Sequence, residues 1–127
     1  MKIYVSGRIT DNPTYVQDFK DVEEKLKQYE DIEPLNPVNL DPVDMENRFS
    51  KDAWFNFMDR DMRLVEECDA IILITKRSAN WKKSPGARIE YWVAKKFNKK
   101  IFYGIDHFIR WYNKEKRYAL YSELAVF

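Results

Sequence analysis

The sequence predicts an α/β fold, a three-layer sandwich with a mostly parallel, flavodoxin- or Rossmann-like sheet. Short apolar runs typical of strands alternate with longer segments whose apolar residues recur at helical spacing, and the connections between them are short. Residues 69–75 (DAIILIT) form an almost unbroken apolar run, which is typical of a strand buried on both faces of a parallel sheet. Residues 1–127 are therefore expected to form one domain, with a core over 1–104 and a helical, aromatic extension over 105–127.

The first half of the chain is expected to contain two strands and two helices. Residues 2–6 (KIYVS) form the first expected strand. Pro13 is expected to begin a helix, because proline suits the first helical position. The apolar face of that helix consists of Tyr15, Phe19, Val22 and Leu26. A short strand at 32–35 precedes a polar, proline-containing connection at 38–50, and a second helix is expected over 52–67.

The second half repeats this alternation. After the strand at 69–75, the loop KRSANWKK leads to a helix that begins at Ser84, because Ser-Pro-Gly supplies a serine N-cap and a proline at the first helical position. One face of this helix is expected to be apolar, with Ile89 at its edge. That face consists of Ala87, Val93, Ala94 and Phe97. A strand is expected at 100–103 (KIFY), followed by a helix and a tail over 106–127.

Charge and composition exclude several classes of function. The chain has 22 basic and 21 acidic residues, and a net charge of +1 provides no electrostatic footprint for duplex nucleic acid. A single cysteine, Cys68, excludes an internal disulfide and a thiolate-rich metal site, and a single histidine, His107, argues against a zinc enzyme and a Ser-His-Asp triad. We expect no metal and no cofactor. No signal peptide or membrane span is recognisable, which predicts a cytoplasmic protein without a membrane partner.

Ligands of α/β sandwiches bind beyond the carboxyl ends of the strands, where the strand order reverses. Two segments follow predicted strands there, residues 6–8 (Ser-Gly-Arg) and the loop that reaches 84–86 (Ser-Pro-Gly). Backbone N–H groups, the guanidinium of Arg8 and a helix N-terminus are each suited to an anion. The alternatives are an ordinary turn at the first segment and a plain helix cap at the second. The basic loop around Trp81 is either a solvated surface or a nucleotide contact.

Two carboxylates fall on the apolar faces of predicted helices. Glu90 follows Ala87 by three residues and precedes Ala94 by four, and Asp61 follows Met58 by three. Burying an unpaired carboxylate costs on the order of several kcal/mol. Either each acid is satisfied by a backbone N–H or a nearby Lys or Arg, or the two acids form a pair for nucleophilic and acid–base chemistry, as in glycosyl transfer.

Three segments in order resemble the nucleoside 2-deoxyribosyltransferase superfamily. They are IYVSGRI at 3–9, DMRLVEECDAIILI at 61–74 and SPGARIEYWVA at 84–94, and the similarity extends over roughly residues 1–104. The resemblance is to a small branch with YxSGPxT and SxGAxxE motifs, and also to the related 2′-deoxynucleoside 5′-monophosphate N-glycosidases. Two positions depart from the pattern: the usual proline after Ser-Gly is Arg8, and the glycine expected soon after Thr10 is Asp11.

The resemblance implies roles for individual residues. Glu90 is implied to be the nucleophile that attacks the anomeric carbon, Asp61 the acid beside the base, and Tyr4 a hydrogen-bond donor to the nucleophile. Ser84 stands where the monophosphate-hydrolysing members place a phosphate-binding serine, which favours a 5′-monophosphate over a free nucleoside. The implied substrate-binding residues are Ser6, Gly7, Arg8, Ser84, Gly86 and Ala87.

The resulting expectation is an enzyme that cleaves the N-glycosidic bond of a (deoxy)nucleoside 5′-monophosphate or nucleoside, by hydrolysis or base transfer. The alternative is a non-catalytic nucleotide-binding sensor or an interaction module on the same fold. The expected partner is thus a small-molecule nucleoside or nucleotide. The resemblance also implies a homodimer or higher homo-oligomer, for which the aromatic residues of 105–127 offer a candidate interface.

Overall fold

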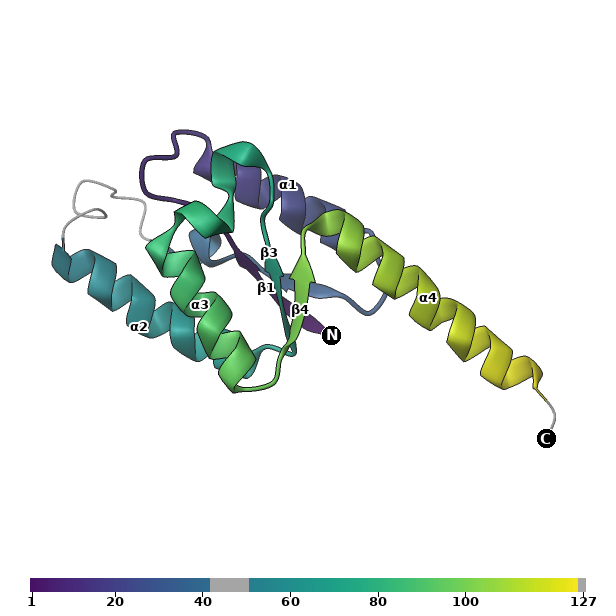
Figure 1. The fold of residues 1–127 in the computed structure, drawn as a ribbon. Coiled ribbons are helices and arrows are strands. Elements are labelled where there is room, and N and C mark those ends of the chain that lie inside the picture. Colours follow the sequence, from purple (N-terminus) through teal and green to yellow (C-terminus); the bar gives the residue numbers. More distant parts are fainter. Residues whose placement is uncertain (42–50, 126–127) are drawn as a thin grey trace.

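A computed structural model describes residues 1–41 and 51–125, and within them four parallel strands form one sheet with helices on both faces (Figure 1). The strand order is β2-β1-β3-β4. The strands are β1 Lys2–Ser6, β2 Glu33–Leu35, β3 Ala70–Leu73 and β4 Lys100–Tyr103. The α-helices are α1 Tyr15–Lys27, α2 Lys51–Glu67, α3 Pro85–Lys96 and α4 Ile105–Leu124, and short 3-10 helices span η1 Pro37–Leu40, η2 Arg77–Ala79 and η3 Trp81–Lys83. The predicted three-layer α/β sandwich is confirmed.

The sheet separates two apolar layers, because neighbouring residues of a strand point to opposite faces. On one face Ile3 and Ile72 pack in the cluster that includes the buried residues of α1 and α4. On the other face Tyr4 and Ile71 pack in the cluster that includes those of α2 and α3. Figure 1 shows α2 and α3 side by side on their face of the sheet.

The position of β3 agrees with its unbroken apolar run. All four of its residues are buried, with β1 on one side and β4 on the other. The chain passes from β1 outward to β2 and then crosses back beyond β1 to β3, so the strand order reverses between β1 and β3. The carboxyl ends of these two strands therefore border the crevice in which such folds bind ligands.

Most predicted elements begin within one residue of the observed ones, and the helix expected from Pro13 differs most. It begins at Tyr15, because Asn12 forms a turn in which its Oδ1 accepts a hydrogen bond from the backbone N–H of Thr14 at 3.1 Å. The central part of the expected connection, residues 42–50, lies outside the described residues.

The expected apolar face of α3 is correct at its buried centre and wrong at its end. Ala87 and Ala94 are 1% and 0% exposed, and Ile89, expected at the edge of the face, is 36% exposed, whereas Phe97 is 44% exposed. Phe97 is the C-cap of α3, where the chain leaves the helix, and Asn98 then turns it with a φ of 55°. The helical periodicity that groups Phe97 with Ala94 no longer applies there.

Helix α4 packs on the sheet with its first half and extends past it with its second half (Figure 1). Phe108 is fully buried, and the hydroxyl of Tyr112 donates a hydrogen bond to the backbone C=O of Glu30 at 3.0 Å. Farther along, Tyr118 and Leu124 are exposed. Among the helices of the described residues, none combines the length and the apolar character that crossing a membrane requires.

Candidate active site

Glu90 of α3 and Asp61 of α2 line one pocket beyond the carboxyl end of β1. The two residues are only 6% and 7% exposed, and the cavity measures about 60 Å³. The other lining residues come from the loop after β1, from α2 and from the first turn of α3: Gly7, Ile9, Thr10, Trp54, Phe57, Met58, Ser84, Gly86 and Ala87. The fold thus brings together two acids that lie on the apolar faces of separate helices.

Side chains of β1 hold the Glu90 carboxylate through both of its oxygens. The hydroxyl of Ser6 donates to Oε1 at 2.7 Å, and the hydroxyl of Tyr4 donates to Oε2. Tyr4 and Ser6 are two residues apart in a strand and therefore point to the same face of the sheet. Neither lines the pocket itself, so both support Glu90 from the sheet side.

Arg60 is the cationic partner of Asp61. One of its guanidinium nitrogens lies 2.8 Å from Oδ1 of Asp61 and 2.9 Å from Oδ1 of Asp41, which follows η1. The same group donates to the backbone C=O of Pro37 at 3.4 Å. A buried acid with a purely structural role needs a partner such as a nearby arginine, and Arg60 is such a partner. The structure therefore agrees with a structural role for Asp61, although Asp61 also lines the pocket.

Burial changes the acidity of both carboxyl groups. Loss of solvent raises the pKa of Glu90 to about 8; the negative charge of Asp61 adds to this rise, and the hydroxyls of Tyr4 and Ser6 oppose it. Burial likewise raises the pKa of Asp61, against the attraction of Arg60. Burial and the charges of both acids raise the pKa of Tyr4, so its hydroxyl stays protonated. Each carboxyl group therefore favours its protonated form more than an exposed carboxyl does.

Three residues of α2 form the apolar wall of the pocket. Trp54, Phe57 and Met58 precede Asp61 by seven, four and three residues and so share its face of the helix. A side-chain carbon added to Gly86 would lie 3.1 Å from the sulfur of Met58, so the glycine allows α2 and α3 to approach closely. The spacing of Trp54, Phe57 and Met58 from Asp61 is the sequence signal that could have placed them in the pocket wall.

The first turn of α3 presents groups suited to an anion. The hydroxyl oxygen of Ser84 accepts from the backbone N–H of Ala87 at 3.2 Å, which leaves the hydroxyl hydrogen free to donate. Pro85 has no N–H, and within residues 1–41 and 51–125 the amide of Gly86 donates no hydrogen bond. Ser84 and Gly86 therefore offer two donors to the pocket, at the positive end of the helix dipole.

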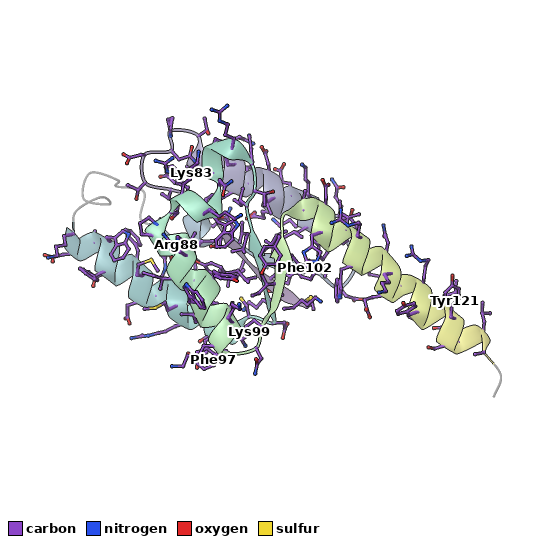
Figure 2. The ribbon with its side chains drawn as sticks, in the orientation of Figure 1. Lys83, Arg88, Phe97, Lys99, Phe102 and Tyr121 are labelled. Carbon is purple, nitrogen blue, oxygen red and sulfur yellow. The ribbon has the colours of Figure 1, made fainter. Side chains whose placement is uncertain are left out.

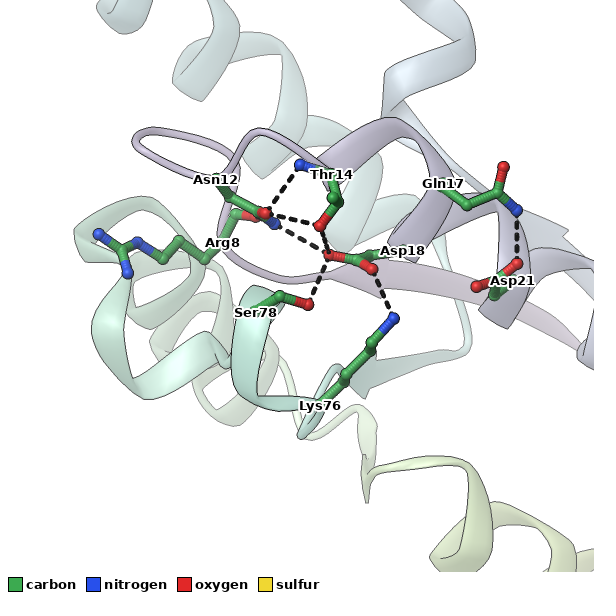
Figure 3. A network of polar contacts seen from close by, with 8 residues as sticks. All are labelled: Arg8, Asn12, Thr14, Gln17, Asp18, Asp21, Lys76 and Ser78. Atoms are coloured by element: carbon green, nitrogen blue, oxygen red, sulfur yellow. Dashed lines mark hydrogen bonds and ion pairs between the residues drawn. The ribbon is translucent and has the colours of Figure 1, made fainter.

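Arg8, expected to bind substrate, is not among the residues that line the pocket. Its Nε donates to the backbone C=O of Thr10 at 3.1 Å, and its backbone N–H donates to the C=O of Ala79 at 3.0 Å. Its side chain is not part of the pocket lining, and Figure 3 shows the guanidinium extended away from its neighbours. A phosphate contact would require this side chain to turn.

The loop after β1 needs two special backbone positions. Asp11 has a φ of 60°, in the left-handed region that glycine adopts most readily, at the position where the resemblance leads to the expectation of a glycine. Gly7 is packed closely, because an added side-chain carbon would lie 2.8 Å from Cδ1 of Ile74 and 3.0 Å from the C=O of Ala79. Both positions set the path of the loop beside the pocket.

A buried carboxylate fastens this loop to the segment after β3 (Figure 3). Asp18 of α1 accepts hydrogen bonds from Asn12 at 3.2 Å, Thr14 at 2.9 Å, Lys76 at 2.9 Å and Ser78 at 2.8 Å. Burial acts to raise the pKa of Asp18, but these hydrogen bonds, led by that of Lys76, outweigh it and hold the pKa below its ordinary value. The sequence analysis missed this network, since Asp18 lies 58 and 60 residues from two of its partners.

The remaining titratable candidates lie away from the pocket. Cys68 is buried, and Nδ1 of His107 accepts a hydrogen bond from the backbone N–H of Tyr103 at 2.9 Å. In the part of the chain that the structure describes, no three side chains of His, Cys, Asp or Glu gather closely enough to hold a metal ion.

Comparison with protein families matches residues 1–103 to the family described as "Domain of unknown function (DUF4406)". A search of curated proteins finds no match. The matched range contains all four described strands and α1 to α3, and it ends before α4. Every lining residue of the Glu90 pocket falls within it.

Proposed function

The chain belongs to the DUF4406 family, whose description names no activity, and we propose that it cleaves the N-glycosidic bond of a nucleoside 5′-monophosphate or nucleoside. One observation carries the proposal: Glu90, oriented by Tyr4 and Ser6, faces the same pocket as a second acid, Asp61. The three motifs that resemble nucleoside 2-deoxyribosyltransferases support it. The raised pKa of Asp61 agrees with its proposed role as the proton donor.

In the proposed first step, ionised Glu90 attacks C1′ of the sugar. A C1′–O bond forms as the C1′–N bond breaks through an oxocarbenium-like state, and the electron pair of the broken bond leaves with the base. Protonated Asp61 transfers its proton to the departing base, directly or through one water molecule. Water then attacks C1′ and gives one proton to the Asp61 carboxylate, while the C1′–O bond to Glu90 breaks. This yields the free sugar or sugar phosphate and restores both acids. A second base in place of water gives transfer.

The shape of the site suggests where the substrate lies. The cavity of about 60 Å³ is far smaller than pockets that hold a whole small ligand, on the order of 300 Å³ or more. It shares Thr10 and Trp54 with a shallower hollow of about 440 Å³, which Lys51 and Phe55 also line. We place the reacting sugar at Glu90, a 5′-phosphate at the first turn of α3, and the base along the aromatic residues of α2.

The test is release of free base from a panel of nucleosides and nucleoside monophosphates. Glu90→Gln and Glu90→Ala should lower the rate by at least about 1000-fold, because each removes the nucleophile. Glu23→Gln is the matched control: it also removes a buried carboxylate, 8% exposed, but on α1 and outside the pocket lining. Turnover in a Glu90 variant equal to that of the Glu23 variant would refute the nucleophile role.

A non-catalytic nucleotide sensor is the second candidate, and two observations favour it. A pKa of about 8 leaves much of Glu90 protonated at neutral pH, and a protonated carboxyl is a poor nucleophile. Arg60 also favours the ionised form of Asp61, which cannot donate a proton. Saturable binding of a nucleoside monophosphate, without base release from any member of the panel, would select the sensor over the enzyme.

The proposal includes a homodimer or higher homo-oligomer in a cytoplasmic location. Its support is the exposed apolar group on the second half of α4, which includes Tyr118, Tyr121 and Leu124. Light scattering that finds only monomers would contradict this part of the proposal and leave the chemistry at Glu90 unaffected.

A further inference from the structure

The net charge of +1 conceals a strong separation of charge along the chain. Residues 1–75 hold nine basic and seventeen acidic side chains. Residues 76–100 hold nine basic side chains and one acidic one, Glu90, which is buried in the pocket. The segment from the end of β3 to the start of β4 is therefore the cationic part of an otherwise acidic or nearly neutral protein.

Several of these cations lie on or beside α3. Figure 2 shows Lys83, Arg88 and Lys99 following one another from the N-terminal to the C-terminal end of that helix. Lys82 and Lys95 belong to the same surface and are also exposed. Within residues 1–41 and 51–125, no ion pair joins any of these five side chains to a carboxylate. Their charge is available to an anionic partner.

Aromatic rings lie among these cations. Trp81 and Tyr91 have ring centroids 4.9 Å apart, and those of Tyr91 and Trp92 are 5.5 Å apart. Trp92 is 62% exposed, Tyr91 is half-buried, and Trp81, 8% exposed, forms the floor beneath them. The ammonium of Lys95 lies 5.3 Å from the Tyr91 ring and 5.4 Å from the Trp92 ring. Lys82 and Arg88 join the three rings in lining a hollow of about 360 Å³, which has no acidic residue in its lining.

We propose that this surface, formed by Trp81, Lys82, Arg88, Tyr91, Trp92 and Lys95, binds single-stranded nucleic acid. Exposed rings stack unpaired bases, and unpaired cations beside them contact the phosphates that link those bases. A duplex conceals its base faces and would leave the rings unused. An anionic membrane is the alternative partner, because membrane-binding helices also expose rings and lysines. Here, however, the rings and cations line a hollow, and a hollow can receive a single base.

The surface is separate from the catalytic pocket. Arg88, Tyr91 and Trp92 line the outer hollow, and none of them lines the cavity of Glu90, which lies against α2. The proposal therefore does not depend on base release, and a variant of this surface leaves the pocket residues in place.

The experiment measures fluorescence anisotropy of a labelled oligothymidylate of about 15 nucleotides titrated with the full chain. We expect saturable binding, with a slope of log K against log salt of about −2, as three neutralised phosphates would give. Trp92→Ala should weaken binding roughly tenfold, because one stacked base is lost. Arg88→Gln should weaken binding and make the salt slope shallower by about 0.7.

Matched controls lie outside this surface. Phe97→Ala removes a ring that is 44% exposed, and Arg117→Gln on α4 removes an exposed cation. The proposal is overturned if the oligonucleotide does not bind at low salt, or if Trp92→Ala and Arg88→Gln bind as tightly as their controls. Equal or tighter binding of the matching duplex overturns it too, as does binding of phosphatidylserine-containing vesicles in place of the oligonucleotide.

Discussion

Glu90 is a carboxyl group that the fold removes from water and then supplies with two hydroxyl donors. Burial favours its protonated form, whereas the hydrogen bonds from Tyr4 and Ser6 favour the ionised form. The effect of burial is larger than that of the two hydrogen bonds, so the pKa of Glu90 is raised overall. A substrate that brings a developing positive charge to C1′ would shift the balance toward the ionised form, which is the form that the proposed reaction needs.

The raised pKa of Glu90 makes stability depend on pH. The protonated carboxyl contributes stability below the ordinary pKa of glutamate, and this contribution is lost as the pH rises toward about 8. Glu90→Gln cannot ionise, so we expect it to be more stable than the wild type at pH 9, by on the order of a few kcal/mol, and by much less at pH 5. Urea denaturation at both pH values measures the difference. A difference that does not change with pH would show that Glu90 titrates normally.

The ends of α3 show how a few residues define an element. Ser84 caps its start, and at its end the N–H of Lys99 donates to the C=O of Ala94 at 2.9 Å while that of Asn98 donates to the C=O of Lys95 at 3.1 Å. This is a Schellman motif with Asn98 in the left-handed position that glycine prefers. Asparagine is tolerated there, but it is not the most favourable residue.

Asn98→Gly should therefore stabilise the protein by about 0.5–1 kcal/mol, because glycine adopts the left-handed conformation without steric cost. Asn113→Gly is the matched control in the interior of α4, where the same change should destabilise by about 0.3 kcal/mol, since asparagine is itself a poor helix former. Urea midpoints of the two variants test the pair. A loss of stability in Asn98→Gly would contradict the assigned C-terminal motif.

The whole molecule depends on the first half of α4. The family match ends at residue 103, yet Phe108 is buried in the same cluster as Ile3 and Phe102. Ring contacts at 5.3 Å to Phe102 and 5.2 Å to Tyr29 hold Phe108 in place. The core therefore continues past residue 104, whereas the second half of α4 contributes little to it.

Two truncated chains test the contributions of the two halves of α4. A chain that ends at residue 113 should unfold cooperatively with a melting temperature within a few degrees of the full chain, whereas one that ends at 104 should not fold. Circular dichroism melts measure both.

In the full chain, Phe108→Ala should lower the free energy of unfolding by about 3–5 kcal/mol and Tyr118→Ala by less than about 0.5 kcal/mol. Equal effects of the two substitutions would contradict this division of α4.

Periodicity alone determined the elements, the central position of β3 and the burial of Asp61 and Glu90. The spacing of apolar residues reports which face of a helix or strand is buried, and this information is local. Periodicity does not apply where the chain leaves regular structure. The pattern therefore placed Phe97 on the buried face, although it is exposed, and could not show that Arg8 does not line the pocket.

Only the tertiary structure decided which residues meet. The hydrogen bonds from Tyr4 and Ser6 to Glu90 connect residues that are 86 and 84 positions apart in the sequence. No pattern within either segment can therefore predict these contacts. The fold likewise collected Trp81, Arg88 and Trp92 into one surface, although the sequence showed only a basic loop and a helix. Local sequence sets the direction of each side chain relative to its own element; packing of the elements sets what that side chain reaches.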